Sequence, residues 1–266
     1  MRPAMIQSVT GLLGGTFNPG EDPRNPPFHA ADYAGASTAV IGVLAAYTRM
    51  LRTGEGGFVD ISMYESLMSM LDIKLSSAMG RLAGTPDTRE IEVWGTNPRY
   101  RSYATKDGKA VTVGLLEASI WKKFCDAIGR PDLITHDETP EDRLTSHGAH
   151  TARYREALTH FCASQTRDEI IARMQALGIP ITPVYDQDEA LVSDIAVERG
   201  VVDIIEDDVE GRIVHLANPL RHSHMVKPRT VGPALGADTD SVLSDLGFSA
   251  DERKAFADKG VIEHRP

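Results

Sequence analysis

The 266-residue sequence has only two cysteines, Cys125 and Cys162, and this number excludes a disulfide framework. Each lies in an amphipathic stretch with apolar neighbours, so we expect two buried free thiols. Such low cysteine use suits a reducing compartment, and we expect a cytoplasmic protein. No basic segment followed by an apolar run opens the chain, so the sequence predicts no signal peptide.

Motifs that bind phosphate, nucleotide or metal are also missing. The sequence has no GxGxxG, GxxxxGK[ST], GxSxG or HExxH motif. Its nine histidines are scattered, and the close pairs His147/His150 and His222/His224 lack cysteines or carboxylates at metal-binding spacing. We therefore expect solvated loop histidines and no metal site. The net charge of −10 repels phosphate backbones, which argues against a nucleic-acid partner.

The longest run without charge, Tyr33 to Thr48, is 16 residues long (YAGASTAVIGVLAAYT). A membrane-spanning helix needs about 20 apolar residues, and this run is rich in Gly, Ala, Ser and Thr instead of Leu and Phe. The run predicts a buried helix whose small side chains allow close approach, and no membrane partner.

The hydrophobic and charged fractions, 41% and 25%, are those of an ordinary globular chain. Hydrophobic periodicity predicts helices over 1–14, from Asp32 through the uncharged run, 64–82, 117–129, 151–163, 167–177 and from Ser249 onward. Thr166 with Glu169 and Ser249 with Glu252 predict capping boxes at the last two starts. Alternation and turn residues predict strands at 58–63, 101–105, 110–113, 179–184, 201–205 and 212–217. The turn Lys106–Lys109 predicts a hairpin of the second and third of these strands, and a second hairpin is expected around Gly211. We expect residues 131–150 to be irregular and residues 218–236 to form an extended tail.

Two carboxylates stand where chemistry is possible. Asp32 lies between a Pro/Gly-rich loop (15–29) and the small-residue helix, so it could cap the helix or act as a nucleophile or base. Glu117 stands where an apolar strand passes into a helix, so it could cap that helix or face a pocket. The residues alone leave both alternatives open.

Four segments, in order along the chain, resemble one family: ADYAGASTAVIGVLAAYTRMLRTGEGG, YRSYATKDGKAVTVGLLEASIW, GIPITPVYDQDEAL and GADTDSVLSDLGFSADERKAF. Together they are similar to the class III CoA-transferases, a family that includes the α-methylacyl-CoA racemases. The resemblance implies an α/β fold with a Rossmann-like large domain and a smaller α/β domain, assembled as an intertwined dimer. We expect 1–74 and 201–266 to be parts of the large domain and 75–200 to be the smaller domain.

The same resemblance implies a function. Asp32 matches the carboxylate that attacks the thioester of an acyl-CoA, forms a mixed anhydride and then an aspartyl-CoA thioester, and passes CoA to a second carboxylic acid. Tyr100 and Glu117 would line the site for the acyl group and CoA. Coenzyme A thioesters and carboxylates would be substrates, with no permanently bound cofactor and no metal.

Alternatives within and outside this family remain. The histidine that serves as second base in the racemases falls at Arg2, so a CoA-transferase is favoured over a racemase, although Glu117 matches a residue of the racemase side. Gly57, Asp238 and Phe28 depart from the family pattern. Met1 falls inside that pattern, which predicts a missing N-terminal segment. We therefore expect a homodimer, a hetero-oligomer whose second chain supplies that segment, or a non-catalytic subunit or remnant.

Overall fold

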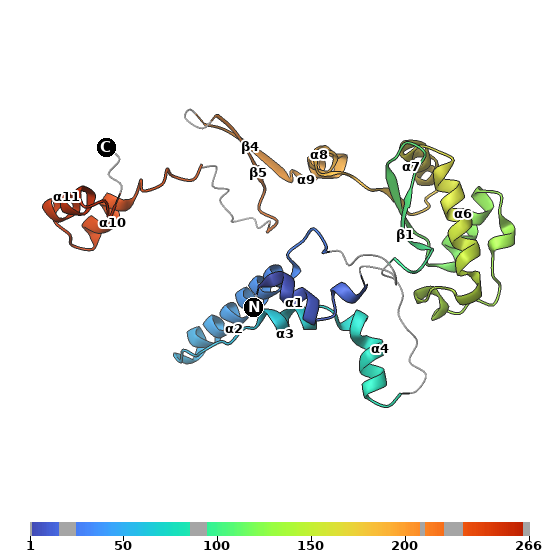
Figure 1. The fold of residues 1–266 in the computed structure, drawn as a ribbon, viewed down its shortest axis with the longest axis horizontal. Coiled ribbons are helices and arrows are strands. Elements are labelled where there is room, and N and C mark those ends of the chain that lie inside the picture. The colour runs from blue at the N-terminus through green and yellow to red at the C-terminus, as the bar shows by residue number, and fades with distance from the viewer. Residues whose placement is uncertain (1, 16–24, 86–94, 208–210, 221–230, 263–266) are drawn as a thin grey trace. The chain divides into compact units, whose positions relative to one another are not determined.

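A computed structural model describes residues 2–15, 25–85, 95–207, 211–220 and 231–262 (Figure 1). It is a mixed α/β chain that divides into two compact units, Met1–Val184 and Tyr185–Pro266. The expected division into 1–74 with 201–266 and 75–200 stays a prediction.

Three helices of the first unit pack around small residues. They are α1 (Pro3–Val9), α2 (Ala30–Thr53) and α3 (Met63–Ser69), and their shared core contains Ile6, Ala31, Ala34 and Leu67. At Gly35 of α2, an added Cβ would lie 2.6 Å from Cγ of Met63. A side chain at this position would collide with α3, so the small residues do allow the close approach that the sequence predicted.

The prediction that α2 is buried is wrong for this chain. Only 11% of its most apolar 18-residue window is buried, and several large side chains are exposed, including Ile41, Leu44, Tyr47 and Leu51. The helix is also longer than the uncharged run, and by length and composition alone its 24 residues could cross a membrane. The buried residues are confined to its first turns, because only there do α1 and α3 cover it.

Two predictions on either side of α2 need correction. Residues 58–62 form no strand, because a strand needs a hydrogen-bonded neighbour and none of the described residues provides one. Val59 and Ile61 instead lie against Gly42 of α2. The helix expected over 64–82 is two helices, α3 and α4 (Asp72–Leu82), and the helix expected over 1–14 ends at Val9 before a short 3₁₀ turn, η1 (Leu13–Gly15).

Residues 95–184, which we call the sheet lobe, contain a three-stranded antiparallel sheet. Its strands are β1 (Tyr100–Ala104), β2 (Ala110–Gly114) and β3 (Ile181–Pro183), with β2 in the centre. The hairpin pairs Tyr100 with Gly114 and Ala104 with Ala110, and β3 pairs Ile181 with Val113. The predicted hairpin and the predicted strand near residue 181 are therefore confirmed.

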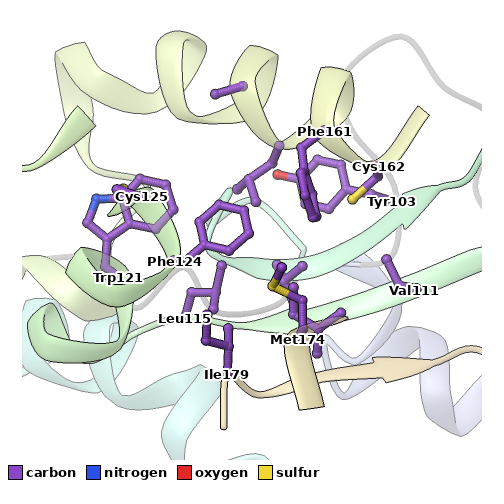
Figure 2. Packing of buried hydrophobic residues seen from close by; sticks show 14 of the residues in the cluster. Tyr103, Val111, Leu115, Trp121, Phe124, Cys125, Phe161, Cys162, Met174 and Ile179 are labelled. Atoms are coloured by element: carbon purple, nitrogen blue, oxygen red, sulfur yellow. The ribbon is translucent and has the colours of Figure 1, made fainter. Parts of the chain in front are cut away.

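Helices α5 (Ala118–Ala127), α6 (Thr151–Ala163) and α7 (Arg167–Ala176) complete the sheet lobe. Their apolar faces meet the buried face of the sheet in one core (Figure 2). Phe124 lies at its centre, with its ring centroid 5.7 Å from that of Trp121 and 5.2 Å from that of Phe161. Cys125 and Cys162 are free and buried in this core, as expected, and burial raises the pKa of each thiol to about 12.

Residues 131–150 connect α5 to α6 through three short 3₁₀ turns: η2 (Pro131–Leu133), η3 (Asp142–Leu144) and η4 (Gly148–His150). The irregular segment predicted here is confirmed. It is nevertheless anchored, because Trp121 Nε1 donates to the carbonyl of Leu133 and Asn97 Nδ2 donates to that of Arg143.

The second unit contains a hairpin of β4 (Val202–Asp207) and β5 (Gly211–Leu216), which confirms the prediction. It also contains the helices α8 (Gln187–Val192), α9 (Asp194–Arg199), α10 (Thr239–Asp245) and α11 (Ala250–Asp258). The capping boxes predicted at Thr166 for α7 and at Ser249 for α11 are both present. Most of the tail expected over 218–236, with His222 and His224, lies outside the described residues.

Candidate active site

Asp32 is the third residue of α2, and its side chain is exposed. The N-cap of the helix is His29, and no side chain makes a capping hydrogen bond. Asp32 therefore does not cap α2. A negative charge in the first turn is favoured by the helix macrodipole. Beside it, the rings of Phe28 and Tyr33 stack with centroids 4.9 Å apart, both about half exposed. The carboxylate therefore stands next to an exposed aromatic pair at the start of a small-residue helix.

Glu117 is the N-cap residue of α5, but its side chain makes no capping hydrogen bond, and it is exposed. Tyr100 begins β1 and is 44% exposed. Glu117 lies in the turn after β2, because Tyr100 pairs with Gly114, the last residue of β2, and Glu117 follows three residues later. Tyr100 lines a hollow of about 520 Å³ on the outer face of the sheet, together with Ser102, Thr112, Gly114 and Thr182 among others.

The structure thus brings Tyr100 and Glu117 to one end of the sheet. Asp32 belongs to the group of α1, α2 and α3, which we call the helical cluster, and no hydrogen bond or ion pair within the described ranges joins it to either residue.

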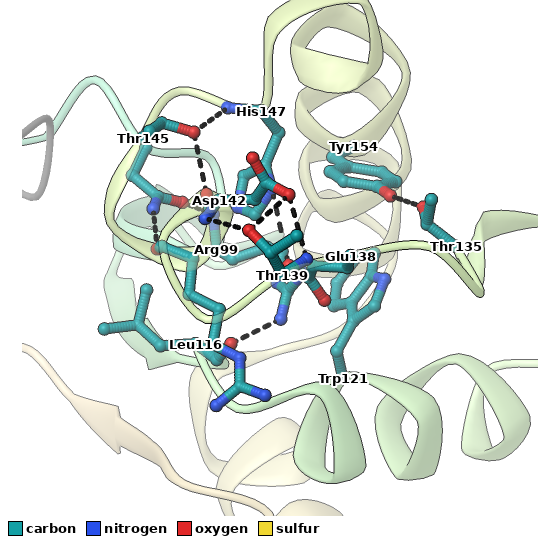
Figure 3. A network of polar contacts seen from close by, with 12 residues as sticks. Arg99, Leu116, Trp121, Thr135, Glu138, Thr139, Asp142, Thr145, His147 and Tyr154 are labelled. Atoms are coloured by element: carbon teal, nitrogen blue, oxygen red, sulfur yellow. Dashed lines mark hydrogen bonds and ion pairs between the residues drawn. The ribbon is translucent and has the colours of Figure 1, made fainter. Parts of the chain in front are cut away.

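A buried polar network that the sequence did not predict includes Leu116, the residue before Glu117 (Figure 3). Its centre is Arg99, which is fully buried. The guanidinium donates from Nε to the carbonyl of Leu115 at 2.8 Å, from Nη2 to that of Leu116 at 2.6 Å, and from Nη1 to Oε1 of Glu138 at 2.5 Å. Burial lowers the pKa of Arg99, and the Glu138 carboxylate acts in the opposite direction.

His147 adjoins this network, which corrects the expectation of a solvated loop histidine. Its side chain is only 4% exposed, and its Nδ1 lies 3.6 Å from Oε1 of Glu138. Its Nε2 is buried and has no hydrogen-bond partner among the described residues. Burial, followed by the charge of Arg99, lowers the pKa of His147 to about 4, so the imidazole is neutral near pH 7. It lines a hollow of about 480 Å³ with Asp142 and Tyr154 among others.

Sequence reasoning missed Arg99, Glu138 and His147 because their partners are far apart in the chain. Arg99 and Glu138 are separated by 39 residues, and neither belongs to a periodic pattern or a known motif. The segment Asn97–Arg99 gives one signal after the fact, since an Asn-Pro pair next to an arginine at a strand start is typical of a hydrogen-bonded turn. Within the part of the chain that the structure describes, no group of three His, Cys, Asp or Glu side chains could hold a metal ion.

Comparisons with known proteins agree on one family. A family model described as CoA-transferase family III matches residues 3–239. The beta subunit of a succinyl-CoA–L-malate CoA-transferase from Chloroflexus aurantiacus is 27% identical over 225 residues, which cover 84% of this chain and 55% of that protein. The human α-methylacyl-CoA racemase is 24% identical over 273 residues, which cover 96% of this chain and 66% of the racemase.

The fold has a counterpart among solved structures. A CAIB/BAIF family protein from Brucella suis superposes with a TM-score of 0.66 at 21% identity, covering 92% of this chain and 62% of that one. At 21% identity this structural similarity supports the fold and nothing more. The chain spans about half the length of the succinyl-CoA–L-malate relative. The match of the family model to most of the chain, on a fold shared with that structure, shows that this chain belongs to CoA-transferase family III.

Proposed function

We propose that this chain carries the nucleophile of an enzyme that moves CoA from an acyl-CoA to a second carboxylic acid, with Asp32 as that nucleophile. The observation that carries the proposal is the exposed Asp32 carboxylate, which lies in the first turn of α2 without serving as its cap. Membership of CoA-transferase family III supports the reaction class. A carboxylate suits this task because it exchanges one activated acyl group for another without ATP or metal.

The proposed reaction balances in four steps. A carboxylate oxygen of Asp32 attacks the donor thioester, which forms a mixed anhydride and releases CoA thiolate. The thiolate attacks the Asp32 carbonyl carbon, which gives an aspartyl-CoA thioester and frees the donor as its carboxylate. The acceptor carboxylate attacks that thioester, forming a second anhydride and thiolate. The thiolate then attacks the acceptor carbonyl, which yields the new acyl-CoA and restores the Asp32 carboxylate.

Tyr100 and Glu117 would line the acyl site in this proposal, next to the hollow on the outer face of the sheet. The substrates would be coenzyme A thioesters and carboxylates, without a resident cofactor, in a cytoplasmic enzyme with a Rossmann-like large domain. The assembly would require Asp32, on the helical cluster, to reach the Tyr100 end of a sheet lobe. That sheet lobe would belong to the same chain or to a partner in an intertwined dimer.

Isotope transfer tests the nucleophile directly. An acceptor carboxylate labelled with ¹⁸O should leave one label in the Asp32 side chain after turnover with succinyl-CoA, read by peptide mass spectrometry. Asp32→Ala should abolish both labelling and CoA transfer. Asp72→Ala is the matched control, because Asp72 is also an exposed carboxylate in the first turn of a helix, α4. Transfer retained by Asp32→Ala, or a label on another residue, would overturn the assignment.

Racemisation is the second candidate function, since the Glu117 carboxylate makes no capping hydrogen bond and is available to transfer a proton. The position expected to hold the other base is Arg2, and a guanidinium offers N–H donors but no acceptor for that proton. Deuterium entering the α-carbon of an α-methylacyl-CoA, without exchange of the acyl group, would favour the racemase. Acyl exchange without deuterium entry would favour the transferase.

We also propose that α2 is covered by further polypeptide in the working enzyme, as a homodimer or hetero-oligomer. The exposed apolar side chains Ile41, Leu44, Tyr47 and Leu51 support this, because soluble monomers rarely leave so large a contiguous apolar surface open. The relative from Chloroflexus is itself named as a beta subunit. Native mass spectrometry of the protein purified from its own host should show a second chain or a second copy in fixed ratio, and a stable monomer would contradict it.

A further inference from the structure

The turn that carries Glu117 has backbone groups that the sheet does not satisfy. Strand β2 ends at Gly114, so the carbonyls of Leu115 and Leu116 leave the ladder before α5 begins. Leu115 is fully buried, and buried carbonyls require hydrogen-bond donors. Glu117 follows immediately, so whatever holds these two carbonyls also sets where the Glu117 side chain starts.

Arg99 supplies both donors. Its Nε donates to Leu115 and its Nη2 to Leu116, while its own backbone carbonyl accepts from the amide of Leu115 at 2.8 Å. The turn is thus held by three hydrogen bonds to one residue. The planar fork of a guanidinium is suited to this, because it addresses two acceptors at a fixed spacing.

Other contacts keep Arg99 itself in place. Its amide donates to Oδ1 of Asn97 at 2.8 Å, and its guanidinium lies 4.9 Å from the centre of the Trp121 ring. Oε1 of Glu138 accepts from the remaining nitrogen, and the Glu138 side chain is only 6% exposed. The charge is therefore balanced, and the contacts with Trp121, Glu138 and the two carbonyls restrict the plane of the guanidinium.

Arg99 is also the residue before Tyr100. Tyr100 is the first residue of β1, and Arg99 is bonded to the turn before Glu117. A shift of Arg99 would therefore move Tyr100 and the turn at Glu117 together. We propose that Arg99 is a positioning residue for acyl transfer: it fixes Glu117 and Tyr100 relative to each other at one end of the sheet. This inference rests on the proposed function, because it assigns Arg99 a role through two residues of that site.

The competing explanation is that Arg99 only stabilises the sheet lobe. Arg99→Lys separates the two, because lysine keeps a positive charge for Glu138 but has a single nitrogen that cannot reach both carbonyls as a fork. Arg130→Lys is the matched control, since Arg130 makes a bidentate but exposed pair with Asp132 at 2.8 and 2.9 Å on the same lobe.

The first measurement does not depend on activity. Backbone ¹⁵N relaxation should show the order parameter of the Glu117 amide falling from about 0.85 to below about 0.6 in Arg99→Lys. The amides of Val111 and Val113 in β2 should be unchanged, and Arg130→Lys should match the unmodified protein. An unchanged Glu117 amide, or equal loosening of the whole sheet, would overturn the positioning role even if CoA transfer is never detected.

The second measurement is a double-mutant cycle on the full assembly. Arg99→Lys should lower kcat/KM for CoA transfer by about tenfold to a hundredfold, the range expected when a site group is displaced by an ångström. Added to Glu117→Gln, it should cause a smaller further loss than in the unmodified protein, because the part of its effect that passes through Glu117 is already lost. Effects that multiply would overturn the proposal. If the unmodified assembly transfers no CoA, the proposed function fails and the relaxation result alone decides.

Glu138→Gln guards against a lysine variant that does not fold. Glutamine still offers Nη1 an acceptor and leaves both carbonyl bonds, so the protein should fold while the guanidinium loses its charged partner. The order parameter of the Glu117 amide should then fall, but by less than in Arg99→Lys, and the change should be confined to the turn at Glu117. No change at Glu117 in a folded Glu138→Gln protein, or loosening spread evenly over the sheet, would overturn the proposal.

Discussion

The buried His147 makes the stability of the sheet lobe depend on pH in a defined direction. Its folded-state pKa of about 4 lies below the ordinary value of 6.5, and desolvation is the main cause. The charge of Arg99 and the proximity of His150 act in the same direction, and Asp142 opposes them. Glu138 is 3.6 Å away, but its carboxylate is already paired with Arg99.

The sign follows from proton uptake. At pH values between these two pKa values, His147 is protonated in the unfolded chain but not in the folded chain. The free energy of unfolding therefore falls as the pH falls. The full stability is present above about pH 6.5 and is lost toward pH 4, at up to about 1.4 kcal/mol per pH unit. From about pH 7.5 to about pH 5 the loss from His147 alone is about 2 kcal/mol.

Urea unfolding at several pH values measures this loss. His147→Asn removes the imidazole and keeps a residue that tolerates the left-handed backbone found here, with φ of 64°. Between about pH 7.5 and about pH 5, the unfolding free energy of this variant should fall by about 2 kcal/mol less than that of the unmodified protein. Carboxylates that titrate in the same range are common to both proteins and cancel in the difference. His160→Asn, at an exposed position on α6, should leave the slope unchanged. Equal slopes for the His147 variant and the unmodified protein would refute the reasoning.

Two further predictions concern the core of the sheet lobe. Phe124→Ala should lower the free energy of unfolding, measured by urea titration, by about 3–5 kcal/mol, because it leaves a cavity between two aromatic rings. The control Phe58→Ala removes a side chain that is 93% exposed, so it should change this free energy by less than about 0.5 kcal/mol. Cys125 and Cys162 should react with a thiol reagent only after unfolding, since burial raises the pKa of both thiols to about 12; rapid reaction in native buffer would contradict their placement in the core.

Local signals in the sequence were sufficient for several elements. The turn Lys106–Lys109 predicted the β1–β2 hairpin, and Thr166 with Glu169 predicted the start of α7, because the residues that stabilise these features are neighbours in the chain. The same capping signal, Asp186 with Glu189, begins α8 and could have been used to predict it.

Features that depend on distant partners were not predictable in this way. The alternation over 58–63 indicated a strand, but strand formation depends on a neighbour that the local pattern does not contain. The composition of α2 indicated burial, yet burial depends on what covers the helix. His147 was assigned to solvent because its loop is polar, whereas Glu138 and Tyr154 enclose it. Of the site residues, Asp32 and Glu117 were singled out from the sequence pattern and Tyr100 from the resemblance, and the roles of all three stay proposals.

The late return of β3 to the sheet has a consequence for synthesis of the chain. Val113 pairs with Ile181, so β2 lacks its second neighbour until the 68 residues from 114 to 181 have been translated. The β1–β2 hairpin forms from local contacts, but one edge of β2 stays open through the emergence of α5, α6 and α7. On the ribosome, that edge is available to other nascent chains for the whole interval. A chain released before Ile181 would keep the edge open permanently, so premature termination in α7 should yield aggregated product while termination after Val184 should not.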